Sequence, residues 1–176
     1  MANTIILNEK SFQNAICRIA NDIIIDNKNI QKIAIVGIHS HGVCVAKKIL
    51  IKITRLADIG DKYQIPFGTL DITLYRDDLN DLKIPVIKDT IIPFDINNKS
   101  IVLVDDVLYT GRTVRAALDV LMDFGRPKSI KLAVLIDRGS HELPIKADYV
   151  GVRHNNAKGF IKVKCVETDG VDGVYE

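Results

Sequence analysis

The sequence contains no tryptophan, and aromatic residues make up only 6% of its 176 residues. The hydrophobic share is nevertheless 47%, so the core must be built mainly from Ile, Val, Leu and Ala. A chain of this length with 26% charged residues has the ordinary balance of a globular protein. We therefore expect residues 1–176 to form a single domain.

Cysteine is scarce, and Cys17, Cys44 and Cys165 are too far apart to form a Cys-x-x-Cys pair. This pattern predicts neither a disulfide framework nor a zinc site, and we expect each cysteine to be a small buried residue in a reducing cytosol. The N-terminus lacks the basic region and apolar core of a signal peptide. No apolar run approaches the ~20 residues of a membrane span. These absences predict a cytoplasmic protein without membrane contact.

An excess of one charge is also missing, because 24 basic residues face 22 acidic ones. The balance is uneven along the chain, however. The stretch from Arg126 to Lys164 carries nine Lys or Arg against three Asp or Glu, whereas the tail carries only acids, at Glu167, Asp169, Asp172 and Glu176. Two ordinary solvated faces are one interpretation; the other is a basic surface that binds a polyanion.

Hydrophobic periodicity predicts helices that alternate with short strands. Ser11 is the expected N-cap of the first helix, and Gly125 followed by Pro127 marks the end of a later one. The residues expected to share the apolar faces of three helices are Phe12, Ile16, Ile19, Ile23 and Ile24; Val43, Ala46, Lys47, Leu50 and Ile53; and Val114, Ala117, Leu118, Leu121 and Met122.

The apolar runs 33–38, 101–104 and 130–136 are typical of buried parallel strands, and residues 159–166 alternate as in a half-exposed strand. Residues 69–74 also alternate and predict a strand with one exposed face. The charged residues 75–88 are expected to form an exposed, mobile loop. The order of elements predicts an α/β fold, with a mostly parallel sheet flanked by helices.

One segment has the strongest chemical pattern: Val104-Asp105-Asp106-Val107-Leu108-Tyr109-Thr110-Gly111-Arg112-Thr113. Two carboxylates end a buried strand, and carboxylates accept hydrogen bonds from the vicinal hydroxyls of a sugar. Gly111 lets a ligand approach the backbone, the two threonines add hydroxyl donors, and the following helix N-terminus suits a phosphate. Two alternatives remain: an acidic strand end without a ligand, and a magnesium site built directly by the two acids.

This segment resembles the signature of the type I phosphoribosyltransferases. The resemblance narrows to the PyrR family, pyrimidine-operon attenuation proteins that also have uracil phosphoribosyltransferase activity, and it covers nearly the whole chain. The segments that carry it are Gly68–Leu79, Asp105–Ala117, Leu135–Gly139, Glu142–Ile145 and Ala147–Gly151. It implies a type I phosphoribosyltransferase fold with a flexible loop over the site and a small hood.

The resemblance also implies the reaction: uracil and phosphoribosyl pyrophosphate give UMP and pyrophosphate, with Mg²⁺ carried on the sugar substrate and no protein metal site. Carried over, Asp105 and Asp106 bind the ribose hydroxyls. The residues implied to bind the 5′-phosphate lie in the loop Val107, Leu108, Tyr109, Thr110, Gly111, Arg112 and Thr113.

Three further parts of the site follow from the resemblance. The turn with Ser40, His41 and Gly42 contacts pyrophosphate, Arg76 of the mobile loop assists there, and Arg138 contacts uracil or UMP. Each has a plainer alternative. The turn can simply connect a strand to a helix, Arg76 can be a surface ion pair, and Arg138 can pair with Asp137 or Glu142.

The chain departs from the family pattern at several positions. His41 stands where an arginine is usual, which replaces a permanent cation with a conditional one. Asn21, His141 and the stretch Val152–Ala157 differ in regions associated with RNA contact. Fewer cations there imply weaker binding to an mRNA leader. The histidines His39, His141 and His154 lack metal spacing, and we expect no ligand role for them.

Three functions compete at this point. The leading one is an enzyme that makes UMP and doubles as a pyrimidine-responsive RNA regulator. The second is an RNA-binding nucleotide sensor with little catalysis, and the third is a purine phosphoribosyltransferase. The resemblance also implies a homodimer or a higher homo-oligomer.

Overall fold

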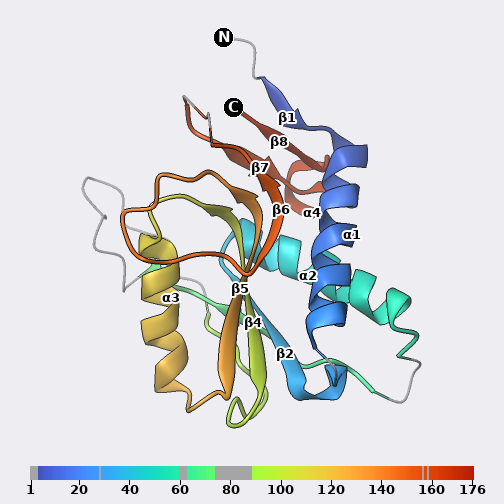
Figure 1. Cartoon of the computed structure of the whole chain (residues 1–176), viewed down its shortest axis with the longest axis vertical. Helices are drawn as coiled ribbons and strands as arrows, with labels where there is room; N and C mark the ends of the chain where they lie inside the picture. The colour runs from blue at the N-terminus through green and yellow to red at the C-terminus, as the bar shows by residue number, and fades with distance from the viewer. Residues whose placement is uncertain (1–3, 28, 60–62, 74–88, 156, 158) are drawn as a thin grey trace.

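A five-stranded parallel sheet forms the centre of the computed structural model (Figure 1). The structure describes residues 4–27, 29–59, 63–73, 89–155, 157 and 159–176. In spatial order the strands are β3 (Phe67–Leu70), β2 (Ile33–Ile38), β4 (Ser100–Leu108), β5 (Ser129–Asp137) and β6 (Tyr149–Arg153). Neighbouring strands in this sheet are parallel, which confirms the predicted α/β class.

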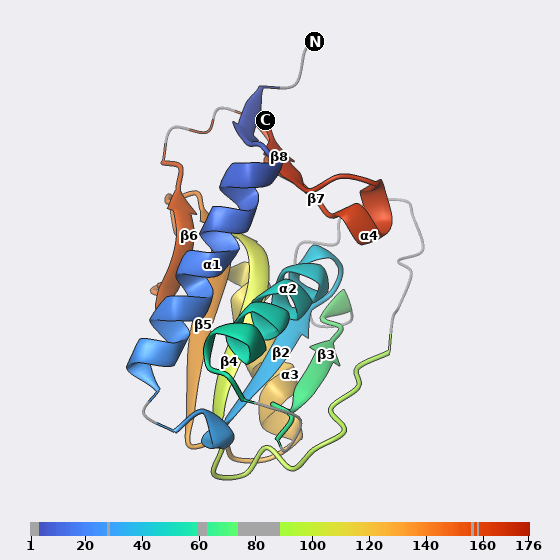
Figure 2. The same cartoon turned by 90° about the vertical axis from the view of Figure 1, so that its right-hand side faces the viewer.

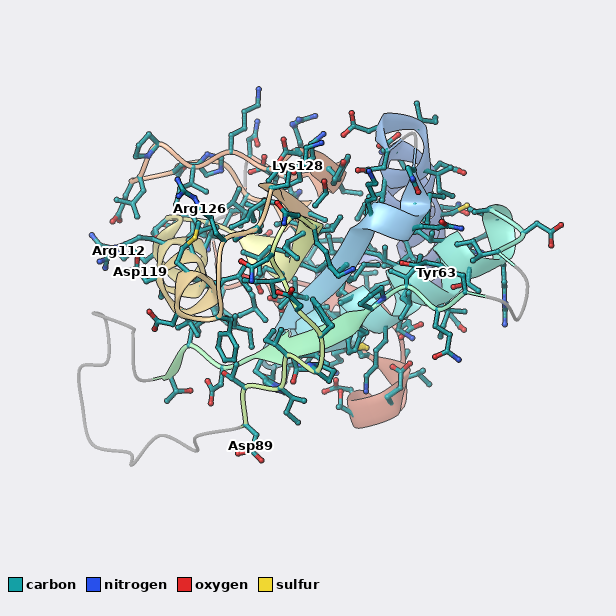
Figure 3. The ribbon with its side chains drawn as sticks, turned by 90° about the horizontal axis from the view of Figure 1, so that it is seen from below. Tyr63, Asp89, Arg112, Asp119, Arg126 and Lys128 are labelled. Atoms are coloured by element: carbon teal, nitrogen blue, oxygen red, sulfur yellow. A yellow bond between two sulfur atoms is a disulfide. The ribbon has the colours of Figure 1, made fainter. Side chains whose placement is uncertain are left out.

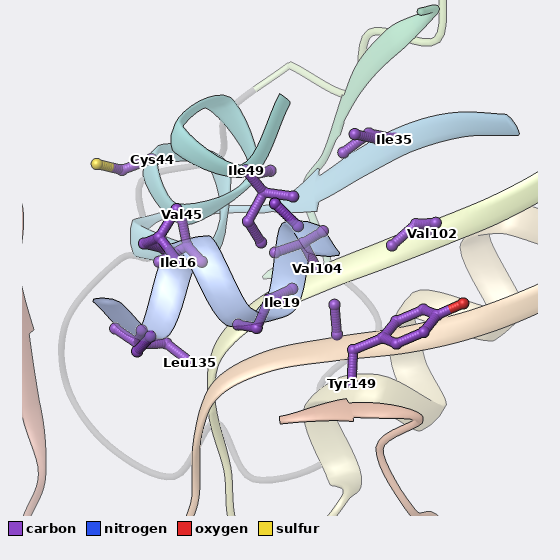
Figure 4. Packing of buried hydrophobic residues seen from close by; sticks show 14 of the residues in the cluster. Ile16, Ile19, Ile35, Cys44, Val45, Ile49, Val102, Val104, Leu135 and Tyr149 are labelled. Carbon is purple, nitrogen blue, oxygen red and sulfur yellow. The ribbon is translucent and has the colours of Figure 1, made fainter. Parts of the chain in front are cut away.

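Helices cover both faces of the sheet (Figure 2). Helices α1 (Glu9–Asp26) and α2 (His41–Leu56) lie on one face, and α3 (Arg112–Asp123) lies on the other. Each face therefore has its own aliphatic cluster. Residues of the first cluster labelled in Figure 4 include Ile16, Ile19, Ile35, Val45, Ile49, Val102, Val104 and Leu135.

A second, smaller sheet lies beyond the carboxyl end of the large one. It joins the two ends of the chain in the antiparallel order β1 (Ile5–Leu7), β8 (Gly173–Tyr175) and β7 (Lys162–Lys164). The short helices are η1 (Ile30–Lys32) and α4 (Val166–Asp169). This small sheet and α4 occupy the place of the expected hood. The predicted strand over residues 159–166 is too long, because only three residues find a partner strand.

The N-cap of α1 is Asn8, so the prediction of Ser11 is wrong by one turn. The Asn8 side chain accepts a hydrogen bond from the Ser11 backbone N–H at 2.9 Å, and the Ser11 hydroxyl lies 2.8 Å from the same amide oxygen. An asparagine caps as well as a serine, and the two residues here stabilise one helix start together. Four of the five residues predicted for the apolar face are fully buried, and Ile24 is half-buried.

The apolar faces of the other two helices are confirmed in part. In α2, Lys47 is exposed and Ile49 is buried, because the helix buries a wider face than the predicted stripe. In α3, Met122 is exposed and Val120 is buried. Gly125 follows the C-cap residue Phe124 with φ at +144°, which confirms its predicted position after the helix.

The strand predictions are likewise confirmed in part. All six residues of β2 are buried, as expected for a parallel strand covered on both faces. The predicted strand over residues 69–74 is shifted: β3 spans Phe67–Leu70, where it pairs with β2. The predicted mobile loop, with Arg76, lies outside the described residues. Among the helices of the described ranges, none combines the length and apolar character needed to cross a bilayer.

Candidate active site

A pocket of about 620 Å³ opens at the carboxyl ends of β2 and β4, where open α/β sheets bind their ligands. It brings together the acidic pair, the following loop, the turn after β2 and Arg138. The lining residues are His39, Ser40, His41, Ile72, Asp105, Asp106, Val107, Leu108, Tyr109, Thr110, Gly111, Arg112, Thr113, Val114, Arg138, Phe160 and Ile161. Among the described residues predicted for the site, Gly42 is absent from this lining.

The acidic pair lies inside β4 rather than at its end, which corrects the prediction. Strand β5 runs alongside far enough to pair Val107 with Ile136 and Leu108 with Asp137, so the ladder continues past the two acids. Asp105 is buried, and its Oδ1 accepts the backbone N–H of Asp106 at 2.9 Å. Asp106 is half-buried at the pocket wall. The pair thus presents acceptor oxygens from a rigid strand.

The loop after β4 turns directly into α3. Gly111 is the N-cap of α3, with φ at +92°, a conformation that L side chains rarely adopt. The Arg112 backbone N–H donates to the Thr110 hydroxyl oxygen at 3.3 Å. Because the first turn of a helix offers N–H groups and a partial positive charge, this end of α3 gives the pocket a place for an anion.

The segment around Leu143 braces this loop from outside. The Thr110 carbonyl accepts the backbone N–H groups of Glu142 and Leu143 at 3.0 and 3.1 Å. A Cβ on Gly111 would lie 3.4 Å from the Cβ atoms of both Leu143 and Ile145, so the two walls are in close contact. The Glu-Leu-Pro-Ile block of the sequence therefore supports the loop.

The side chain of Arg112 also binds the segment Glu142–Ile145. Its Nε and Nη2 atoms donate to Glu142 Oε2 at 3.0 and 2.9 Å, and both side chains are exposed. Figure 3 shows Arg112 on the outer side of α3, on the same side of the molecule as Asp119. Arg112 is thus a lining residue of the pocket whose guanidinium is held by Glu142.

The turn after β2 contributes the opposite wall. The peptide bond between His39 and Ser40 is cis, and Ser40 is the N-cap of α2. His41 and Gly42 are the first residues of the helix rather than of a separate turn. A Cβ on Gly42 would lie 2.8 Å from the Val104 carbonyl oxygen and 3.0 Å from the Asp105 Cα. Gly42 thus allows α2 to begin directly against the acidic pair.

His41 lies between two carboxylates. Its Nδ1 is 4.0 Å from Asp106 Oδ2, and its Nε2 is 3.4 Å from Asp169 Oδ2 of the C-terminal hood. The Thr168 hydroxyl, the Cys165 backbone N–H and the nearby His41 hold the pKa of Asp169 below its ordinary value. A carboxylate from the far end of the chain therefore lies beside the predicted pyrophosphate turn.

The remaining side of the pocket is aromatic and cationic. The Arg138 guanidinium lies over the Tyr109 ring, 4.1 Å from its centroid. Among the described residues, Arg138 forms no ion pair with Asp137 or Glu142. Asp137 Oδ1 lies 2.9 Å from His141 Nε2 instead, and Glu142 pairs with Arg112. The imidazole of His141 thus contacts the Asp137 carboxylate at the end of β5.

Five lining residues were missed by the sequence analysis: His39, Ile72, Val114, Phe160 and Ile161. Ile72 and Val114 occur in segments that could have indicated them, because Ile72 lies in the stretch Gly68–Leu79 and Val114 directly follows the loop Val107–Thr113. Phe160 carries no such signal, although it is 82% exposed at the pocket wall. It reaches the site only because the small sheet folds over the large one.

The acidic tail is not a plain solvated face, because its carboxylates have cationic partners on other elements. Lys48 contacts both Glu167 and Asp172, His41 contacts Asp169, and His154 lies 3.5 Å from Glu176. Burial lowers the pKa of Lys48, but hydrogen bonds to Glu167 and Asp172 outweigh burial, so the net shift is upward.

Cys44 and Cys165 form a disulfide, although neither was expected to pair. Both are buried, as predicted, whereas Cys17 is a half-buried free thiol. The sequence separation of 121 between the bonded cysteines explains why spacing gave no signal. Cys44, Cys165 and Glu167 also place three possible metal-ligand atoms within 4.8 Å of one another.

Fold and pocket together define the class: an open parallel α/β sheet with, at its carboxyl edge, a pocket that combines two carboxylates with the N-terminus of a helix. Residues 2–168 match the family described as Phosphoribosyl transferase domain. Among solved structures, a hypoxanthine-guanine phosphoribosyltransferase of Bacillus anthracis has a TM-score of 0.73 at 18% identity, with 99% of this chain and 98% of that chain covered. At that identity, the likeness concerns the fold alone.

Curated relatives narrow the class. The Bifunctional protein PyrR of Endomicrobium trichonymphae is 66% identical over 172 residues, which cover 97% of this chain and 96% of that protein. The Bifunctional protein PyrR of Deinococcus radiodurans is 50% identical, with 95% of this chain and 90% of that protein covered. The chain therefore belongs to the phosphoribosyltransferase family, in its PyrR group.

Proposed function

We propose that this protein is a uracil phosphoribosyltransferase that converts uracil and phosphoribosyl pyrophosphate to UMP and pyrophosphate. The observation that carries the proposal is the acidic pair Asp105–Asp106 beside the N-terminus of α3 in one pocket, in a chain of the PyrR group. Sugar hydroxyls and a 5′-phosphate need these two kinds of partner side by side.

The assignment of roles follows the geometry of the pocket walls. Asp105 and Asp106 accept hydrogen bonds from the ribose 2- and 3-hydroxyls, and the loop Val107–Thr113 holds the 5′-phosphate at the start of α3. The turn of Ser40 and His41 faces the pyrophosphate, and Gly42 keeps this turn close to the acids. Arg76, which lies outside the described residues, is proposed to assist there on the strength of the family resemblance alone.

Mg²⁺ enters with the pyrophosphate as part of the substrate. The pocket fits such a substrate, because the carboxylates of Asp105 and Asp106 line it and favour a cation near the ribose hydroxyls that they bind. When bound, the ion neutralises charge on the leaving pyrophosphate. We propose no metal site built by the protein for this reaction.

The chemistry needs no covalent nucleophile, since positive charge develops at the anomeric carbon as pyrophosphate leaves. The protein positions the base and the sugar, excludes water and stabilises the leaving group. The base fits beside Tyr109, with Arg138 against its polar edge and Phe160 at the hood side. Arg138 and Tyr109 contact each other at 4.1 Å, so the cation is already oriented toward that wall.

A second activity is proposed on the name of the relatives, which are called bifunctional. We infer a pyrimidine-responsive regulator that binds an mRNA leader in the cytoplasm. Arg126 and Lys128 are exposed just before β5, at the sheet edge opposite the pocket (Figure 3). Cations there can bind RNA phosphates without entering the catalytic pocket. We also propose that the single domain forms a homodimer or a higher homo-oligomer.

The test of the enzyme is release of pyrophosphate from phosphoribosyl pyrophosphate and Mg²⁺ with uracil, hypoxanthine, guanine or adenine. We expect turnover with uracil and at least about 100-fold less with the purines, since unmatched polar groups in a binding site discriminate strongly. Preferred use of a purine would overturn the uracil assignment. Binding of UMP without turnover of any base would favour the nucleotide sensor instead.

The test of the regulator is binding to leader RNA of a pyrimidine operon, measured with and without UMP at several salt concentrations. The double variant Arg126→Gln, Lys128→Gln should weaken binding and lower its salt dependence, because binding with fewer phosphate contacts releases fewer counterions from the RNA. It should leave uracil turnover unchanged. RNA affinity that is unaffected by UMP would contradict a pyrimidine-responsive role.

A further inference from the structure

The C-terminal segment from Cys165 to Asp172 lies against the first turns of α2, beside the pocket. Lys48 Nζ is 2.9 Å from Glu167 Oε1 and 3.0 Å from Asp172 Oδ2. One turn earlier, His41 Nε2 is 3.4 Å from Asp169 Oδ2. The segment therefore places a carboxylate directly beside the turn that we assign to pyrophosphate.

The Cys44–Cys165 disulfide makes this attachment covalent. Cys44 is the fourth residue of α2, and Cys165 is the N-cap of α4. Their Cα atoms are 6.6 Å apart, within the range of protein disulfides. The bond thus fixes α4, and with it Asp169, relative to the start of α2.

A structural disulfide is unusual in the cytoplasm, where we place the protein, because thiols are kept reduced there and disulfides are mostly transient. Cys44 is the more accessible cysteine of the pair. The residue is 8% exposed against 0% for Cys165, and in Figure 4 the Cys44 sulfur points away from the aliphatic cluster. In the reduced state, the Cys44 thiol can donate to Glu167 Oε2, which lies 3.0 Å from its sulfur.

We propose that Cys44 and Cys165 form a reversible redox site whose oxidation weakens the binding of phosphoribosyl pyrophosphate. Oxidation holds the Asp169 carboxylate beside His41, where it pairs with the imidazole and opposes the pyrophosphate anion. Reduction removes the covalent bond to α2 and leaves α4 held by its ion pairs and hydrogen bonds and by the strands β7 and β8 on either side of it, so Asp169 can move away from His41 and His41 can bind pyrophosphate. This inference rests on the proposed function for the identity of the ligand.

The oxidant is a small-molecule disulfide such as oxidised glutathione. The Cys44 thiolate attacks one of its sulfur atoms, the reagent's S–S bond breaks and one small thiolate leaves. The Cys165 thiolate then attacks the Cys44 sulfur of the mixed disulfide, and the second small thiolate leaves. The protein loses two electrons and two protons, which the reagent takes up as two thiols.

The experiment equilibrates the full chain in glutathione buffers of different ratio and follows three quantities. Alkylation with mass spectrometry gives the Cys44–Cys165 bond, hydrogen exchange gives the mobility of residues 165–176, and calorimetry gives the Kd of phosphoribosyl pyrophosphate with Mg²⁺. We expect the bond to form and break reversibly. Reduction should increase exchange in the segment and tighten ligand binding by about fivefold to tenfold.

Three variants separate the causes. The double variant Cys44→Ser, Cys165→Ser should bind the ligand as the reduced protein does in every buffer, whereas Cys17→Ser should keep the full redox response. Asp169→Asn should bind tightly even when oxidised, because the bond remains but the opposing charge is gone. A weak oxidised Asp169→Asn would overturn the electrostatic explanation.

Other outcomes overturn the proposal in distinguishable ways. Equal ligand binding by the oxidised and reduced forms would remove the regulatory role while leaving the proposed function intact. Failure of both forms to bind would overturn the proposed function and the redox control of this ligand with it, whatever the thiols do. Stoichiometric Zn²⁺ binding by the reduced protein, lost in Cys165→Ser and Glu167→Gln, would identify a metal site instead.

Discussion

The two walls of the pocket are built in different ways. The wall of the acidic pair and the phosphate loop comes from consecutive residues 105–113, on one strand and the helix that follows it. The opposite wall joins the start of α2 to α4, which are more than 120 residues apart along the chain, through ion pairs and a disulfide. The first wall is local and rigid, whereas the second depends on how the chain ends fold over the sheet. We therefore expect catalysis to depend most on the first wall and its control on the second.

The largest effect should come from the local wall. Asp106→Asn keeps the size of the side chain but replaces the charged carboxylate, whose oxygens accept hydrogen bonds from the ribose hydroxyls, with a neutral amide. We expect kcat/KM for phosphoribosyl pyrophosphate to fall by about 100-fold, with the thermal stability nearly unchanged. Steady-state kinetics with uracil measure the loss. Asp119→Asn, on the exposed face of α3, is the matched control, and unchanged kinetics in Asp106→Asn would refute the role of the acidic pair.

The distant wall should be the more sensitive one in stability. Lys48 is 11% exposed and pairs with Asp172, which is 6% exposed, so Lys48→Met leaves a buried carboxylate without its cation. We expect a loss of about 2–3 kcal/mol in the free energy of unfolding, measured with urea. Lys47→Met is the matched control, because Lys47 is exposed on the same helix. Equal losses in the two variants would show that the Lys48 pairs do not hold the segment.

The contact between the two walls can be changed at Gly42. A Cβ there meets the Val104 carbonyl and the Asp105 backbone at 3.0 Å or less, and backbone atoms cannot move aside cheaply. Gly42→Ala should cost about 1–3 kcal/mol of stability and raise the KM for phosphoribosyl pyrophosphate. Gly159→Ala is the control, since its Cβ would find nothing closer than 3.5 Å. A stable Gly42→Ala protein with normal KM would mean that the walls can separate freely.

The ion pair between Arg112 and Glu142, which links the loop Val107–Thr113 to the segment Glu142–Ile145, should contribute less to stability. Arg112 and Glu142 are both exposed, so removing their ion pair with Arg112→Gln should cost no more than about 1 kcal/mol. Glu142→Gln should give the same small change, because each variant breaks the same pair. Urea unfolding of both single variants and the double variant measures the coupling. A much larger loss in kcat for Arg112→Gln than for Glu142→Gln would indicate a direct contact of Arg112 with the substrate.

The smallest effect concerns pH. The folded protein holds the pKa of Asp169 below its ordinary value, so its contribution to stability is present above pH ~4 and is lost as the pH falls through the lower, folded value. Asp169 is on the surface, so we expect it to account for only a small part of the fall in Tm between pH 6 and pH 3, on the order of 1–2 °C. Calorimetry of Asp169→Asn against the parent protein measures it. The same pH dependence in both proteins would exclude a contribution from Asp169.

The sequence analysis succeeded where neighbouring residues decide the structure. The apolar runs predicted β2, β4 and β5, and the segment 105–113 predicted a loop that opens a helix. The errors arise where distant partners decide. Strand β4 extends to Leu108 because β5 lies beside it, and β3 is displaced from its predicted range because its pairing with β2 selects residues 67–70. The error at the start of α1 is local instead: Asn8 rather than Ser11 is the N-cap, and these two polar residues lie only three positions apart.

The sequence alone thus determined the α/β class, the buried strands and the grouping of acids, glycine and threonines in one loop. Periodicity and turn chemistry act over a few residues, so they can be read without a partner. Only the tertiary structure decided that Phe160 reaches the pocket, that Asp169 meets His41 and that Cys44 binds Cys165. These contacts join residues far apart in the chain, and their geometry exists only once both aliphatic clusters have packed and the small sheet has closed over the carboxyl edge of the large one.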